Sequence, residues 1–210
     1  MKNNLLPIAK EGFVSIGFTI LAFILFAIFD LEILEFFTFL LFISLVFVYR
    51  NPERMFPSFE QKSVLSPVDG LVQSIEELED EEYAYRVTIK SSYLNVSLLR
   101  VPLNSQVESL DIKHGARLSP LSALAKDINE RVELIFKDEY DNRVKTIHTL
   151  SRSFDDIKLN LSPNQNIVQG SRYGVMLSGI TTIYLPQNFR INVNIGQEVN
   201  ASQSLVGYFS

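Results

Sequence analysis

The residues from Val132 to Ser151 read VELIFKDEYDNRVKTIHTLS, and this stretch decides the fold class. Two runs in it alternate apolar with polar side chains, and a cluster of Asp, Glu, Tyr and Asn residues separates them. Alternation with a period of two is typical of strands that bury one face. The stretch therefore predicts two short strands joined by a turn.

Runs of the same kind occur on both sides of this stretch, from Val64 to the C-terminus. They read GLVQSIEEL, YRVTIKSS, NVSLLRVP, DIKLNL, TTIYLP and RINVNI. A helical pattern appears in one place, Leu118–Arg131 (LSPLSALAKDINER). Short strands with regular turns favour an all-β domain, mainly antiparallel and built as a barrel or sandwich, over a parallel α/β sheet. We expect one short helix within it.

A weak internal repeat lies near the C-terminus. Four residues recur 32 positions later: Gln165, Ile167, Gly170 and Tyr173 correspond to Gln197, Val199, Ser202 and Leu205. Each copy is expected to be a turn between strands, and paired hairpins of this kind resemble those of biotinyl and lipoyl domains. A carrier domain of that class needs a lysine on a tight turn, and neither copy has one. We therefore expect the repeat to be architectural.

The N-terminal residues are of another kind. Phe13–Phe29 carries no charge, and as a helix it would extend roughly 26 Å, close to the ~30 Å thickness of a bilayer core. Leu31–Tyr49 is a second apolar stretch, with two glutamates near its start. We expect a transmembrane helical hairpin over residues 1–50, a linker over residues 51–63 and the β-rich domain over residues 64–210.

Three other interpretations of the apolar segments stay open: buried helices of a soluble core, a signal peptide, or a re-entrant second segment. The first run is longer than the apolar core of a signal peptide, and no small-residue cleavage site follows it. Basic residues flank the pair, namely Lys2 and Lys10 before it and Arg50, Arg54 and Lys62 after it. Basic flanks stay in the cytoplasm, so we expect the β-domain on the cytoplasmic side of the inner membrane.

The composition limits the chemistry. The chain has no cysteine, which excludes disulfides, thiolate metal sites and a cysteine nucleophile. Two histidines, His114 and His148, are too few for a multi-histidine metal site. The net charge of −5 disfavours nucleic-acid binding, which needs a basic face. We therefore expect neither a metal nor a nucleic-acid partner.

Seven short motifs follow one another along nearly the whole chain. They are IAKEG (8–12), YRNPER (49–54), VLSPVDG (64–70), VSLLRVP (96–102), NER (129–131), GSRYGVM (170–176) and YLP (184–186). In order and spacing they resemble the short, membrane-anchored form of the phosphatidylserine decarboxylase family. The resemblance implies conversion of phosphatidylserine to phosphatidylethanolamine and CO₂ by a pyruvoyl group made from an internal serine. It also implies a membrane phospholipid partner and self-association.

The catalytic groups implied by the resemblance are only partly present. Asp69 is the family aspartate, although a turn residue is an equally good interpretation of it. Ser97 occupies the family histidine position, and a hydroxyl is no base near neutral pH. The Gly-Ser cleavage pair is missing. An alignment on Tyr173 and Gly174 puts Ile180 at the serine position, and an alignment on the YLP motif puts Gly179 there. Neither alignment gives a Gly-Ser pair, and Ser178 is the remaining candidate nucleophile.

Two functions are compatible with this pattern. We predict a non-catalytic relative without a pyruvoyl group, which binds lipid or accompanies an active decarboxylase paralogue. The alternative is a divergent, active phosphatidylserine decarboxylase that uses Ser178. Arg100 and Arg172, with Arg50 and Arg54, are candidates for binding a lipid phosphate because guanidinium offers planar paired donors. Ordinary surface charges are the other interpretation of these arginines.

Overall fold

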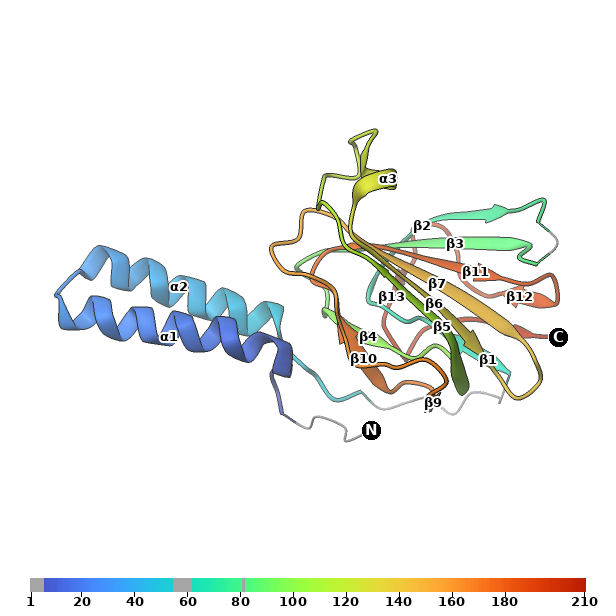
Figure 1. Cartoon of the computed structure of the whole chain (residues 1–210), viewed down its shortest axis with the longest axis horizontal. Coiled ribbons are helices and arrows are strands. Elements are labelled where there is room, and N and C mark those ends of the chain that lie inside the picture. The colour runs from blue at the N-terminus through green and yellow to red at the C-terminus, as the bar shows by residue number, and fades with distance from the viewer. Residues whose placement is uncertain (1–5, 55–61, 81) are drawn as a thin grey trace. The chain divides into compact units, whose positions relative to one another are not determined.

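The computed structural model describes residues 6–54, 62–80 and 82–210. It forms two compact units, one within residues 2–53 and one within residues 54–210. Figure 1 shows the first as a pair of helices and the second as a set of β-strands with one short helix.

The first unit contains η1 (Lys10–Gly12), α1 (Phe13–Ile28) and α2 (Glu32–Val48). The two α-helices lie side by side, and the rings of Phe23 and Phe39 are 6.3 Å apart between centroids. Most of their large apolar side chains are exposed. Within the described residues, Lys10–Ile28 is long and apolar enough to cross a membrane.

The described residues of the second unit form fourteen strands and one helix. Their bounds are β1 (Ser63–Leu65), β2 (Gly70–Glu77), β3 (Tyr85–Ser91), β4 (Leu98–Arg100), β5 (Ser105–Lys113), α3 (Ala125–Ile128), β6 (Arg131–Lys137), β7 (Arg143–Leu150), β8 (Lys158–Leu159), β9 (Asn166–Ile167), β10 (Arg172–Val175), β11 (Gly179–Leu185), β12 (Phe189–Ile191), β13 (Glu198–Val199) and β14 (Leu205–Phe209).

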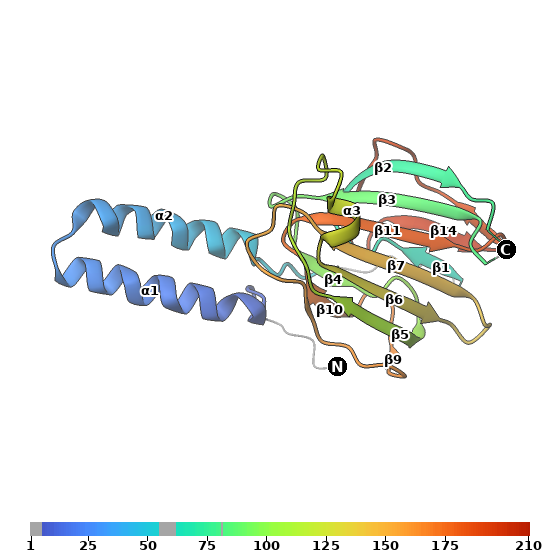
Figure 2. The same ribbon diagram turned by 45° about the horizontal axis from the view of Figure 1, so that its top comes forward.

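The strands form three sheets, with the orders β1-β14-β12, β4-β10-β8 and β13-β2-β3-β11-β7-β6-β5-β9. Every pair of neighbouring strands is antiparallel. Figure 2 shows the broad eight-stranded sheet with the short strands β4 and β10 beside it. The predicted antiparallel β-domain with few helices is confirmed, whereas the barrel or sandwich assignment stays a prediction.

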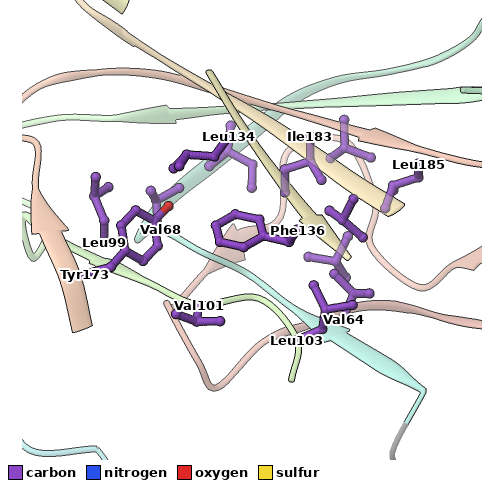
Figure 3. Packing of buried hydrophobic residues seen from close by; sticks show 14 of the residues in the cluster. Val64, Val68, Leu99, Val101, Leu103, Leu134, Phe136, Tyr173, Ile183 and Leu185 are labelled. Atoms are coloured by element: carbon purple, nitrogen blue, oxygen red, sulfur yellow. The ribbon is translucent and has the colours of Figure 1, made fainter. Parts of the chain in front are cut away.

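The core lies against one face of the eight-stranded sheet. β6 and β7 pair from Arg131 opposite Thr149 to Lys137 opposite Arg143, and every second residue of both strands is buried. In Figure 3, Phe136 of β6 points into the cluster formed with residues of β1, β4, β10 and β11. The alternation seen in the sequence therefore marks the two faces of this sheet.

The helix expected over Leu118–Arg131 is much shorter in the structure, where α3 covers four residues, Ala125–Ile128. The side chain of Asn129 accepts a hydrogen bond from Leu118 N at 2.9 Å and donates to the carbonyls of Leu118 and Leu150. These bonds close the preceding segment into a loop, and Arg131 already belongs to β6. Tertiary hydrogen bonds thus override the local helical pattern.

The two copies of the internal repeat form matching turns. Ser162 N donates to Gln165 Oε1 at 3.1 Å, and Asn194 N donates to Gln197 Oε1 at 3.0 Å. The strands β9 and β13 lie at opposite edges of the eight-stranded sheet. Each copy is a turn next to an edge strand, and the purely architectural role of the repeat stays a prediction.

A polar cluster is sealed inside this core. His148 Nδ1 lies 2.8 Å from Thr181 Oγ1, and His148 Nε2 lies 2.6 Å from the hydroxyl of Tyr173. Burial lowers the pKa of His148 to about 3 and raises the pKa of Tyr173. The imidazole is therefore neutral, and both of its nitrogens have partners within the fold.

Acid should destabilise the fold through His148. Its folded pKa of about 3 lies below the unfolded value of about 6.5, so the unfolded chain binds the extra proton between these values. The stability from neutral His148 is complete above about pH 6.5 and falls by up to about 1.4 kcal/mol per pH unit toward pH 3. We expect urea unfolding of His148→Gln to depend less steeply on pH than that of the parent protein. His114→Gln, at an exposed histidine, is the control, and equal slopes for both variants would contradict the prediction.

Candidate functional site

Asp69 lies between β1 and β2, and its carboxylate is bound by two different segments. Arg54 Nη1 donates to Oδ1 at 2.5 Å, and Arg54 Nη2 donates to Oδ2 at 2.6 Å. Ala201 N adds a bond to Oδ1 at 2.8 Å. The side chains of Arg54 and Asp69 are only 9% and 7% exposed. A bidentate guanidinium and a backbone amide thus use both carboxylate oxygens.

Asn104 accepts the corresponding backbone hydrogen bond in the first copy of the repeat. Its Oδ1 accepts a hydrogen bond from Gln169 N at 2.8 Å, and Gln169 precedes Ala201 by the 32 residues of the repeat. The turn bond therefore needs only an acceptor oxygen, which a neutral amide supplies. The negative charge of Asp69 is needed for a different reason, namely to neutralise the buried guanidinium of Arg54.

Ser97 and Ser178 lie close to the segment that connects β10 to β11, two strands of different sheets. Ser97 comes just before β4, and its carbonyl accepts a hydrogen bond from Met176 N at 2.8 Å. Ser178 is half-buried in the bend that joins β10 to β11, and its carbonyl accepts a bond from Ser151 N at 3.2 Å.

Asp69 is linked to the same bend through β3. Ser91 Oγ donates to the carbonyl of Asp69 at 2.6 Å, and Ser91 is paired with Gly179 in the register of β3 and β11. The main chain at Asp69, Ser97 and Ser178 is therefore gathered around one turn. We call this turn, Leu177–Ser178–Gly179, the LSG turn.

The LSG turn is crowded at its last residue. A Cβ atom on Gly179 would lie 2.4 Å from the carbonyl oxygen of Thr149 and 2.8 Å from Met176 Sδ. Met176 is buried, and the nearer neighbour is a backbone oxygen. Gly179, the position that the alignment on the YLP motif places at the family serine, thus has no room for a side chain. Leu177, on the other side of Ser178, is buried.

The arginines proposed as phosphate ligands have contacts within the protein. Arg100 is buried in β4 and donates to the carbonyl of Gly170 at 3.2 Å, and Arg172 of β10 is opposite it. Arg50 donates to the carbonyl of Phe47 at the end of α2. Arg54 was predicted from the sequence to bind phosphate, but it is the ion-pair partner of Asp69. Its place at the end of the YRNPER motif was the only sequence feature that pointed to a specific role.

A cavity of about 610 Å³ lies on the outer face of the eight-stranded sheet. Its wall includes Ile147 of β7, Ile180 of β11 and Lys126 of α3. Asp69, Ser97 and Ser178 are not among its lining residues. The side chains of these three residues therefore do not form the wall of this cavity.

These features define a class of protein: an antiparallel β-domain, preceded by apolar helices, in which the VLSPVDG, VSLLRVP and GSRYGVM motifs meet around one turn. The family model for phosphatidylserine decarboxylase matches residues 41–207. The chain belongs to the phosphatidylserine decarboxylase family.

Several curated relatives are similar over most of their length. The phosphatidylserine decarboxylase proenzyme of Desulfotalea psychrophila is 26% identical over 206 residues, which cover 96% of each chain. That of Carboxydothermus hydrogenoformans is 30% identical over 175 residues, covering 80% of this chain and 81% of the relative. That of Geobacter metallireducens is 28% identical over 217 residues, covering 99% of each.

The ion pair of Arg54 and Asp69 should be important for stability. Arg54→Ala leaves a buried carboxylate without its counter-ion, and we expect a loss of about 3–5 kcal/mol in the free energy of unfolding. Asp69→Asn should cost less than Asp69→Ala, because an amide oxygen still accepts the bond from Ala201 N. Denaturant unfolding measures all three. Arg86→Ala, at the exposed pair with Glu76, is the control and should cost much less. Equal losses for Arg54→Ala and Arg86→Ala would refute the assignment.

Crowding at the LSG turn gives a second prediction. Gly179→Ala should lower the free energy of unfolding by about 1–3 kcal/mol, because the added methyl group meets backbone and sulfur atoms. Gly17→Ala is the matched control, since a Cβ there meets nothing within 4 Å. Thermal unfolding of both variants in the same detergent tests this, and an unchanged melting temperature for Gly179→Ala would contradict it.

Proposed function

We propose that the chain is a membrane-anchored member of the phosphatidylserine decarboxylase family that does not make a pyruvoyl group. In this proposal it acts in phosphatidylethanolamine biosynthesis as a lipid-binding subunit, which self-associates, or as the partner of an active decarboxylase paralogue. The observation that carries the proposal is the crowded LSG turn.

Self-cleavage of the family type needs a serine directly after a flexible peptide link. Glycine before the serine permits unusual backbone angles and a close attack on the preceding carbonyl. In this chain the residue before Ser178 is Leu177, whose side chain is anchored in the core. Gly179 has no space for a serine side chain. The residues at the LSG turn thus do not fit the formation of a pyruvoyl group.

The groups that would assist cleavage also support this proposal. Ser97 stands where the resemblance implies a histidine, and both oxygens of Asp69 are engaged by Arg54 and Ala201. His148 is no substitute as a base. Its imidazole is sealed between Tyr173 and Thr181, and its pKa of about 3 leaves it weakly basic.

The alternative proposal is an active decarboxylase that cleaves before Ser178. Two observations favour it. The main chain of Asp69, Ser97 and Ser178 is gathered around the LSG turn, and Ser178 is partly accessible. The curated relatives are named proenzymes.

The membrane attachment in the proposal rests on the helical unit. Lys10–Ile28 has the length and hydropathy of a membrane span, and α2 beside it also exposes mostly apolar side chains. Lys10 precedes the pair and Arg50 and Arg54 follow it. By the charge rule this favours a two-helix anchor with the β-domain on the cytoplasmic side of the inner membrane.

Intact mass separates the two proposals. The purified full chain in detergent should give one species of 23.9 kDa that does not react with hydroxylamine, because no ketone has formed. The Ser178→Ala variant is the control and should behave identically. A large and a small fragment divided near residue 178, with a hydroxylamine-reactive small fragment that the control lacks, would establish the active decarboxylase instead.

A further inference from the structure

Five large apolar side chains project from three loops at one end of the β-domain. Leu121 is 90% exposed, Leu94 is 77% exposed and Phe154 is 53% exposed, and Leu124 and Ile128 are exposed as well. We call these five residues the apolar rim. The loop that carries α3, with Leu121 and Leu124, stands out from the strands in Figure 1. Exposed apolar groups gathered in this way mark a binding surface.

Hydrogen bonds and a ring contact hold the three loops together. The hydroxyl of Tyr93 donates to the carbonyl of Arg152 at 2.8 Å, and its ring is stacked on that of Phe154 with 5.7 Å between centroids. Arg152 Nη2 donates to Ser119 Oγ at 2.8 Å. The loop after β3, the loop before α3 and the loop after β7 therefore form one surface.

Hydrogen bonds connect the loops of this surface to the LSG turn and to Asp69. Ser151, next to Arg152, donates its amide to the carbonyl of Ser178. Ser91, at the start of the loop that carries Leu94, is bonded to Asp69. Arg54, the first residue of the β-domain, is also bonded to Asp69. The chain coming from the helical unit thus joins the β-domain at the end that carries the rim.

Two ion pairs neutralise part of the charge near the rim. Arg117 pairs with Asp156, and Lys158 pairs with Asp155 at 2.6 Å. The net charge of the whole chain is −5. Attraction to an anionic surface is therefore weak, and burial of the apolar side chains is the force available for binding.

We propose that the apolar rim inserts into a phospholipid bilayer at the boundary between headgroups and acyl chains, and that it holds the LSG turn at headgroup level. Side chains at the tips of separate loops suit a fluid surface, which accommodates each of them independently. The inference rests on the membrane attachment in the proposed function.

The lack of cysteine allows a direct test in the full chain. Single variants Leu121→Cys and Phe154→Cys are labelled with an environment-sensitive fluorophore and reconstituted into phosphatidylcholine nanodiscs that contain nitroxide-labelled lipid. Tyr140→Cys is the matched control, because Tyr140 is also exposed but lies in the turn between β6 and β7, at the opposite end of those strands. We expect quenching at positions 121 and 154 to exceed that at 140 by at least about threefold, with little effect of salt.

The outcomes separate the rim from the anchor. A label at Phe18→Cys on α1 reports the membrane attachment itself. Quenching at position 18 without excess quenching at 121 and 154 overturns the rim proposal and leaves the anchor. No quenching at 18 overturns the anchor, and positions 121 and 154 still decide the rim. A label at 121 that is shielded from aqueous iodide but not quenched by lipid indicates a protein partner and overturns the lipid assignment.

The rim itself is tested by a double substitution. Leu121→Asp with Leu124→Asp should lower lipid quenching of a label at position 154 at least about twofold, because two carboxylates resist burial among acyl chains. Both side chains are exposed, so the fold should be kept, and an unchanged melting temperature verifies this. Undiminished quenching at 154 in the folded double variant would overturn the role of the α3 loop.

Discussion

The buried carboxylate of Asp69 joins three parts of the β-domain that are far apart in the sequence. Arg54 lies before β1, Asp69 lies between β1 and β2, and Ala201 lies between β13 and β14. Removing either charge from water is costly, and the cost is met only when both partners keep this geometry. The ion pair therefore holds the first residue of the β-domain, Arg54, in place. The same carboxylate also holds the turn at Ala201 in the second copy of the repeat.

The repeat gives a structural reason for an aspartate at position 69. Asn104 and Asp69 hold corresponding turns, but only Asp69 faces a buried guanidinium. Replacement of Asp69 by a neutral residue would leave the buried guanidinium of Arg54 without a counter-ion. The stability of the fold is therefore a sufficient reason for an acidic residue at this position. A family aspartate at this position is thus compatible with both proposed functions, and the LSG turn is the better place to distinguish them.

The patterns with a simple period were interpreted correctly. Alternation over Val132–Ser151 predicted β6 and β7, because a strand with one buried face must alternate. β5 (Ser105–Lys113) was missed, since much of it is exposed and its apolar residues do not alternate cleanly. The length of the helix over Leu118–Arg131 was overestimated. Asn129 is hydrogen-bonded to Leu118 and to Leu150 at the end of β7, and the folding that brings these residues together is not visible in the local sequence. Of the candidate site, the sequence supplied Asp69, Ser97 and Ser178 but not their surroundings.

The sequence by itself determined the family, the β-rich class and the apolar N-terminal helices. These follow from residue identity and local periodicity, which need no knowledge of distant contacts. Only the tertiary structure decided that Asp69 is bound to Arg54, that Gly179 lies against the backbone of Thr149 and that His148 is sealed and neutral. Each of these depends on atoms brought together from separate strands, and a sequence read along one chain contains no measure of that proximity.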